Sequence, residues 1–163
     1  MILVLYTDGI RDETTARQFD HNVFAPLRLT RSILPYLRSQ KEGTVVNPSS
    51  LGGMHSFPGN GIYCSTKFAL EAITFALAEE IAPFGLKAMV VQPGYFRTGF
   101  LDGVVMAEGM KEYEGEGSVV AEARRNMGAY NGRQLGNPSV GGVRMVSFPF
   151  YFVGWCKLWE SSF

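Results

Sequence analysis

The stretch that decides the fold is Thr44-Val45-Val46-Asn47-Pro48-Ser49-Ser50. Its β-branched residues predict a short strand over 44–47. The segment that follows, residues 49–61, contains four glycines and a proline and therefore predicts a loop. A helix is expected to begin near Ile62 and to end around Pro83-Phe84-Gly85. Its apolar face is expected to carry Phe68, Ala69, Ala72, Ile73, Ala76, Leu77 and Ile81.

The same alternation of strand and helix continues on both sides of this stretch. Residues 2–6 are typical of a buried strand, and so are residues 87–91, which are closed by Pro93-Gly94. Between the first two strands, residues 12–40 carry a helical pattern that Gly43 is expected to end. Strands joined by crossovers of this length run parallel. The sequence therefore predicts an α/β fold with a doubly wound parallel sheet in three αβα layers. Such sheets bind ligands at the carboxyl ends of their strands.

Composition limits the class of protein. The chain has 163 residues, of which 46% are hydrophobic and 18% charged, and this suits one globular domain. Fifteen basic residues balance fifteen acidic ones, so the charge does not indicate a nucleic acid partner, and a small molecule is expected instead. Two cysteines are too few for a disulfide framework, and Met1 is not followed by a secretory signal pattern, so we expect a cytoplasmic protein.

Tyr63 and Lys67 lie four residues apart at the start of the expected helix, thirteen residues after Ser50. Residues at this spacing share one helix face, so the Lys67 ammonium is expected beside the Tyr63 phenol. A cation in that place favours the phenolate and lowers a phenol pKa that is normally about 10. Tyr63 is therefore a candidate general acid and base that works near neutral pH.

These residues and their neighbours make the chain resemble the classical short-chain dehydrogenase/reductase family over roughly residues 18–98. The Asn-Ser-Tyr-Lys tetrad of the family matches Asn22, Ser50, Tyr63 and Lys67. Its Asn-x-Ser-Ser strand-end motif matches residues 47–50, and its Pro-Gly motif with a later threonine matches Pro93, Gly94 and Thr98. A weaker resemblance points to the branch that contains hydroxysteroid and retinol dehydrogenases.

The resemblance implies a Rossmann-like fold and a hydride transfer between NAD or NADP and an alcohol, ketone or aldehyde, in which Tyr63 moves the proton. The matching lysine of the family also binds the nicotinamide ribose, so Lys67 would both tune the acid and hold the cofactor. Ser50 matches the residue that donates to the substrate oxygen, so Ser50 and Tyr63 are the expected substrate-binding residues. The cofactor-binding residues implied are Asn22, Tyr63, Lys67, Pro93, Gly94 and Thr98. No metal site is expected, because His21 and His55 are isolated.

Asn22 has a physical argument of its own. Pro26 lies four residues later and has no N–H to give to the Asn22 carbonyl. If the segment is helical, that carbonyl is left free and the helix should kink there. In the family, the matching asparagine holds a water through this carbonyl in a proton relay to the lysine. We expect Pro26 to keep the same acceptor available.

The resemblance does not extend to the amino-terminal half of the family. Neither the glycine-rich turn that holds the pyrophosphate nor the residue that selects the cofactor has a counterpart here. We therefore expect an amino-terminally truncated member with an incomplete sheet, for which NAD and NADP both stay open and NADP is placed first.

The expected organisation has two parts. Residues 1–142 form a partial NAD(P)-binding domain, in which segment 95–142 covers the substrate and contains a helix near Val119 to Met127. Residues 143–163 form an irregular apolar and aromatic tail, which is too short and too often interrupted to predict a membrane span.

Two classes of function remain open from the sequence. The first is an oxidoreductase of the short-chain type. The second is a catalytically silent family member that acts as an interaction module and forms a homodimer through helices 12–40 and 62–84, which pack across a dimer in the family. A hydrolase is disfavoured, because the sequence around Ser50 lacks the first glycine of the Gly-x-Ser-x-Gly motif.

Overall fold

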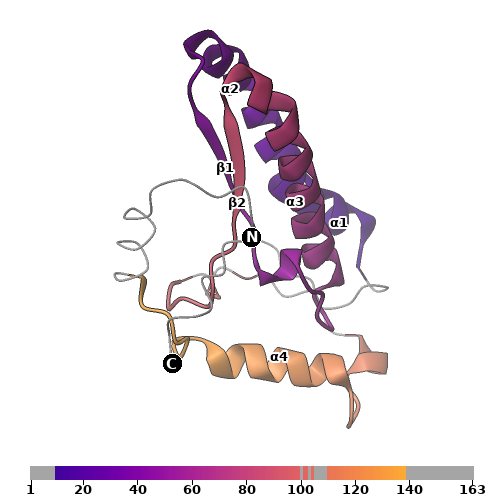
Figure 1. Cartoon of the computed structure of the whole chain (residues 1–163). Coiled ribbons are helices and arrows are strands. Elements are labelled where there is room, and N and C mark those ends of the chain that lie inside the picture. Colours follow the sequence, from indigo (N-terminus) through magenta and orange to yellow (C-terminus); the bar gives the residue numbers. More distant parts are fainter. Residues whose placement is uncertain (1–9, 100, 103, 105–109, 139–163) are drawn as a thin grey trace.

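The computed structural model of the chain describes residues 10–99, 101–102, 104 and 110–138. Helices and strands alternate along it, and a separate helix follows the second strand (Figure 1). The elements are α1 (Asp12–Phe19), a π-helical turn (Asp20–Phe24), α2 (Ala25–Gln40), β1 (Thr44–Pro48), α3 (Gly61–Ile81), β2 (Lys87–Val91) and α4 (Val119–Tyr130). Short 3-10 helices occupy Leu51–Gly53, Ala82–Phe84 and Lys111–Tyr113. The expected strand over 2–6 and the expected tail over 143–163 lie outside the described residues.

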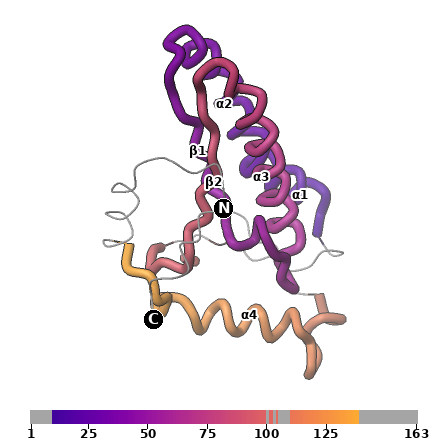
Figure 2. The backbone as a smooth tube through the Cα atoms, in the orientation of Figure 1, coloured from indigo at the N-terminus to yellow at the C-terminus, as the bar shows by residue number. Residues whose placement is uncertain are grey.

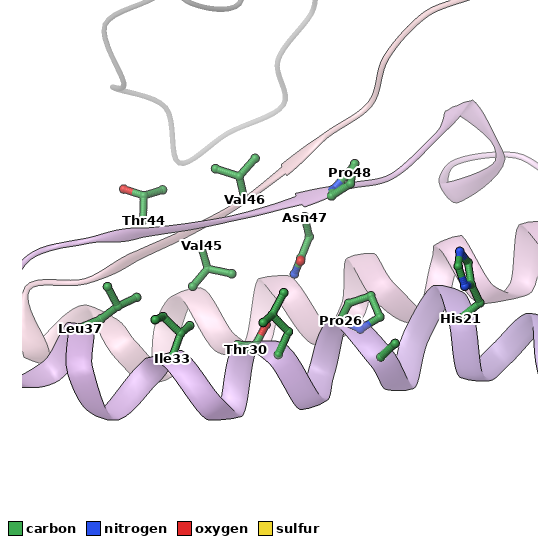
Figure 3. Close-up of a pocket in the computed structure, with 12 residues that line it drawn as sticks. His21, Pro26, Thr30, Ile33, Leu37, Thr44, Val45, Val46, Asn47 and Pro48 are labelled. Atoms are coloured by element: carbon green, nitrogen blue, oxygen red, sulfur yellow. The ribbon is translucent and has the colours of Figure 1, made fainter. Parts of the chain in front are cut away.

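Strands β1 and β2 pair in parallel, in a register that runs from Thr44 opposite Lys87 to Pro48 opposite Val91. The crossover between them is α3, which has 21 residues. Helices α2 and α3 lie on the same face of the sheet, and the side chains of Val45 and Asn47 point toward the helices (Figure 1 and Figure 3). The predicted α/β fold with parallel strands and crossover helices is therefore confirmed.

The core lies between this sheet and its helices. Leu34 of α2, Ile81 of α3 and Leu86 form one buried cluster. The partly buried side chains of Leu37, Leu77 and Ala88 pack against it. Because these residues come from α2, α3 and β2, their burial fixes both helices against the sheet and holds the strand ends in place.

The predicted apolar face of α3 is partly wrong. Phe68, Ala72 and Ala76 are exposed, with Phe68 at 44%. The residues of α3 that are buried are Tyr63, Cys64, Thr66, Leu70, Glu71, Thr74 and Ile81. The polar members of this face are buried because they find hydrogen-bond partners there, from the strands and their ends for Glu71 and Thr74 and from Asn22 for Thr66. Asn47 of β1, for example, donates to the hydroxyl of Thr74 at 2.8 Å.

A π-helical turn interrupts the helix that was expected over residues 12–40. The N–H of Ala25 donates to the carbonyl of Asp20, five residues earlier. Pro26 explains the change, because it cannot continue the α-helical hydrogen bonds at this point. The predicted kink at Pro26 therefore takes the form of this turn. The exposed side chains of Arg28 and Asp20 bond across it at 2.9 and 3.3 Å.

The end of α2 differs from the prediction that Gly43 stops this helix. The helix ends at Gln40, and Lys41 caps it in the left-handed conformation with φ 58°. Gly43 follows with φ 149°, which a side chain rarely tolerates. Gly85, by contrast, caps the 3-10 helix after α3 with φ 77°, at the predicted place.

The helix predicted near Val119 to Met127 is confirmed as α4. Ser118 begins it by accepting a hydrogen bond from the N–H of Ala121 at 3.2 Å. Figure 2 shows α4 lying across the end at which α3 begins. In the described part of the chain, no helix combines the length and the apolar character needed to cross a membrane.

Candidate active site

The candidate site lies where both strands end and α3 begins. Ser50 follows β1, Pro93 and Gly94 follow β2, and Tyr63 is in the first turn of α3. A backbone hydrogen bond of 2.7 Å from the N–H of Ser49 to the carbonyl of Val91 joins the two strand ends. The carboxyl ends of parallel strands meet at one edge of a sheet, and the structure brings the predicted residues together there.

Tyr63 is 7% exposed and forms a small buried cluster with Cys64. Val104 and, from α4, Met127 pack against this cluster. Burial raises the pKa of the Tyr63 phenol above its usual value of 10.0, and a hydrogen bond with Ser50 opposes that rise. The pKa of Tyr63 is therefore raised and not lowered as predicted, because desolvation is the largest effect on the phenol.

Lys67 lies one helical turn after Tyr63, on the same face of α3. Its ammonium donates a hydrogen bond of 3.0 Å to the carbonyl oxygen of Pro48 at the end of β1. The same nitrogen is 5.9 Å from the centre of the Tyr63 ring. Burial lowers the pKa of Lys67, and the charge of Glu71 opposes this change. The ammonium is therefore held between the strand end and the aromatic ring.

Ser50 begins the 3-10 helix Leu51–Gly53. Its Oγ accepts a hydrogen bond from the N–H of Gly52 at 3.2 Å. A hydroxyl that accepts from the backbone still has its hydrogen to donate. Ser50 can therefore donate to the Tyr63 oxygen or to the oxygen of a bound molecule.

Asn22 is 8% exposed and lies in the π-helical turn. Its side-chain amide donates to the hydroxyl of Thr66 at 3.0 Å. Thr66 in turn donates to the backbone carbonyl of Tyr63 at 2.6 Å. The side chain of Asn22 thus supports α3 directly before Lys67. The expected role of its main-chain carbonyl in a proton relay stays a prediction.

The residues after β2 form the open side of the site. Pro93 is half-buried, and Gly94 and Thr98 are exposed. A Cβ built on Gly94 would meet nothing within 4 Å, so a bound molecule can approach the backbone there. Phe96 and Gly136 pair in an isolated parallel bridge, which fastens this segment to the residues after α4.

Several buried polar residues of this region were not predicted. Glu71 accepts hydrogen bonds from Ser49 and Gln92, one residue beyond the end of each strand. Helical spacing could have indicated them, because polar side chains recur every three or four residues after Tyr63. Those residues are Thr66, Glu71 and Thr74, together with Lys67, which was predicted.

A groove of about 510 Å³ runs between α2 and β1 (Figure 3). Its walls are mainly apolar and include Pro26, Ile33 and Val45. Ser50, Tyr63 and Lys67 are not among its lining residues, so it is separate from the candidate site. Across the described ranges, no three His, Cys, Asp or Glu side chains are grouped to hold a metal ion.

The residues present fit the nicotinamide end of a dinucleotide. The hydroxyl of Tyr63 and the ammonium of Lys67 are donors that suit ribose hydroxyls, and the backbone at Gly94 is open. The glycine-rich turn that would bind the pyrophosphate has no counterpart in this sequence. The fit therefore covers the nicotinamide side of the cofactor.

Curated relatives match more than half of the chain. The 3-ketodihydrosphingosine reductase of Bacteroides thetaiotaomicron is 41% identical over 91 residues, which cover 56% of this chain and 34% of that protein. Retinol dehydrogenase 16 of Rattus norvegicus is 35% identical over 100 residues, which cover 61% of this chain and 31% of that protein. The chain thus spans about a third of the length of these relatives.

Solved structures share the fold. A short-chain dehydrogenase from Streptomyces avermitilis aligns with a TM-score of 0.75 and 32% identity, covering 89% of this chain and 52% of that one. A metagenomic short-chain oxidoreductase in complex with NADP aligns with a TM-score of 0.53 and 25% identity, covering 57% of this chain and 42% of that one. Both are similar to this chain in fold.

The family described as short chain dehydrogenase matches residues 6–108. This range includes both strands, α3 and all four residues of the Asn-Ser-Tyr-Lys tetrad. The chain therefore belongs to the short-chain dehydrogenase family of oxidoreductases.

Proposed function

We propose that this chain carries the proton-transfer part of an NAD(P)-dependent oxidoreductase that interconverts an alcohol and a ketone or aldehyde. The observation that carries the proposal is the meeting of Ser50, Tyr63 and Lys67 at the ends of the parallel strands. Because the chain spans only part of its relatives, the proposal concerns the chemistry of this site and not the substrate of a whole enzyme.

Each residue has a role that follows from its contacts. When bound, the nicotinamide would supply or accept the hydride. Tyr63 gives its phenolic proton to the carbonyl oxygen in reduction and takes the alcohol proton in oxidation. Ser50 donates to the same substrate oxygen, since its Oγ already accepts from the N–H of Gly52. Lys67 holds positive charge near the ring and stabilises the phenolate that reduction leaves behind.

The cofactor of this site is proposed to be NAD or NADP. The donors of Tyr63 and Lys67 and the open backbone at Gly94 suit the nicotinamide ribose, which the two cofactors have in common. Asn22, Pro93 and Thr98 remain the other proposed cofactor-binding residues. The discrimination between NAD and NADP depends on the adenosine side, so both must be tested.

The test is a fluorescence titration of the purified chain with NADH and, separately, with NADPH up to millimolar concentration. We expect saturable binding of at least one of them. Lys67→Ala should weaken that binding about tenfold or more, because it removes a charged donor. Glu79→Gln, on an exposed part of α3, should leave it unchanged. Absence of saturable binding at millimolar cofactor would refute the proposal for this chain.

A second candidate function is an interaction module that forms a homodimer. It is supported by the exposed aromatic side chains on α3, where Phe68 is 44% and Phe75 is 58% exposed. A partner that covered them would remove this apolar surface from water. Analytical ultracentrifugation should then find a dimer that Phe75→Asp dissociates. A monomeric wild-type chain at all concentrations would exclude this function.

A further inference from the structure

Glu71 is a buried carboxylate that the proposed proton transfer does not use. The residue is 7% exposed and lies four residues after Lys67 and eight after Tyr63, on the same face of α3. A buried carboxylate is unfavourable unless hydrogen bonds and opposite charge compensate it, so its position requires an explanation. The hydrogen bonds of Glu71 supply this explanation.

One oxygen of Glu71 binds the ends of both strands. Its Oε1 accepts a hydrogen bond from the hydroxyl of Ser49 at 2.5 Å and another from the amide of Gln92 at 2.6 Å. Ser49 directly follows β1 and precedes Ser50, whereas Gln92 directly follows β2 and precedes Pro93. The position of this oxygen therefore sets where the two loops of the site leave the sheet.

The surroundings leave little room for Glu71 to move. A Cβ built on Gly53 would overlap both its Oε1 and the hydroxyl of Ser49. Gly53 is itself buried. The absence of a side chain at this position is what allows the 3-10 helix after Ser50 to pack directly on the hydrogen-bonded pair.

The charge of Glu71 also acts on Lys67. Burial lowers the pKa of Lys67, and Glu71 is the one charged group among the described residues whose field opposes this. The contacts of the ammonium itself are the Pro48 carbonyl and the Tyr63 ring, both of which are uncharged. Without Glu71, nothing of opposite charge would compensate the burial of this cation.

We propose that Glu71 is the positioning residue of the site, holding the ends of β1 and β2 against α3 and placing a negative charge on the helix face that carries Tyr63 and Lys67. The inference rests on the proposed function only in taking Tyr63 and Lys67 as the proton-transfer pair. Its two effects, on geometry and on charge, can be separated by substitution, because a glutamine keeps the accepting oxygen and loses the charge.

The charge effect is tested by NMR titration of the chain labelled with ¹³C-lysine. The signal of Lys67, one of five lysines, is assigned with Lys67→Arg. Glu71→Gln should lower the measured pKa of Lys67, since it removes a nearby negative charge. Glu79→Gln, an exposed carboxyl on the same helix, is the matched control and should not change it. An equal pKa in the wild type and in Glu71→Gln would overturn the charge effect.

The geometric effect is tested by amide hydrogen exchange at Ser49, whose N–H bonds the Val91 carbonyl between the strand ends. Glu71→Ala should speed this exchange about tenfold, whereas Glu71→Gln should leave it near the wild-type rate. If Glu71→Ala does not fold, Gln92→Ala removes one of the two donors and should give the same direction of change. Wild-type exchange in these alanine variants would overturn the positioning role.

Both measurements are made on the chain without cofactor. If no cofactor binds, the NMR and hydrogen-exchange results still test the role of Glu71. If those results contradict the role of Glu71, the cofactor titration still tests the proposed function. The two proposals can thus be judged separately.

Discussion

The acid strength of Tyr63 depends on the balance between burial and hydrogen bonding. The phenol is enclosed by α3 and by side chains from the segment around α4, and desolvation raises its pKa. Ser50 favours the phenolate by hydrogen bonding but does not cancel the effect of burial. The spacing of Tyr63 and Lys67 correctly predicted a shared helix face. It could not predict that the ammonium would donate to the Pro48 carbonyl, because that contact depends on where β1 ends.

The raised pKa of Tyr63 makes a prediction about stability at high pH. A group whose folded pKa lies above its unfolded value contributes stability below about pH 10, and this contribution is lost as the pH rises through the folded pKa. The free energy of unfolding of the wild type should therefore fall relative to that of Tyr63→Phe above about pH 10. Urea unfolding at a series of pH values measures this difference. Tyr36→Phe, at a side chain 67% exposed, is the control and should follow the wild type.

At the scale of elements, the strand boundaries were predictable and the buried faces were not. The predicted strands over 44–47 and 87–91 appear as Thr44–Pro48 and Lys87–Val91, because β-branched runs bounded by turn residues are strong local signals. The burial of α3 depends on partners that are distant in sequence. Counting apolar residues placed Phe68 and Ala72 inside, but the strand ends bury Glu71 and Thr74 instead.

The cap of α2 gives a prediction at the same scale. Lys41 adopts the left-handed conformation, which costs a residue with a side chain about 1–2 kcal/mol. Glycine avoids this cost, although its greater freedom in the unfolded chain lowers the free energy of unfolding by about 0.5–1 kcal/mol. Lys41→Gly should therefore raise the free energy of unfolding by roughly 0.5 kcal/mol. Thermal unfolding checks this, and Lys87→Gly in β2 should have the opposite effect, since glycine is unfavourable in a strand.

At the scale of the whole molecule, some contacts between the segments of the site could be predicted from the sequence and others could not. The strand ends and the first turn of α3 were expected to meet, because parallel strands present their carboxyl ends at one edge. Segment 95–142 was expected by resemblance to the family to cover the substrate, but the packing of Met127 of α4 on Tyr63 and Cys64 was not predicted. No periodic pattern in residues 95–118 indicates which surface α4 will contact. The bridge between Phe96 and Gly136, a pairing of residues far apart in sequence, joins the segment after β2 to the residues after α4.

This bridge gives the last prediction. A Cβ at Gly136 would lie 2.6 Å from the Tyr95 carbonyl oxygen and 2.7 Å from the Phe96 ring, so Gly136→Ala should break the pairing. If the bridge holds the α4 segment over the site, its loss will expose Cys64, which is 1% exposed and packs with Met127.

The measurement is the rate at which a thiol reagent labels Cys64, in a background of Cys156→Ser. Overpacking of about 1–3 kcal/mol corresponds to labelling that is about fivefold faster or more in Gly136→Ala. Gly128→Ala in α4, where a Cβ would meet nothing within 4 Å, is the matched control and should label no faster than the wild type. Equal labelling of Gly136→Ala and the wild type would mean that α4 stays on Tyr63 without the bridge, held by the contacts of Met127 and Val104 alone.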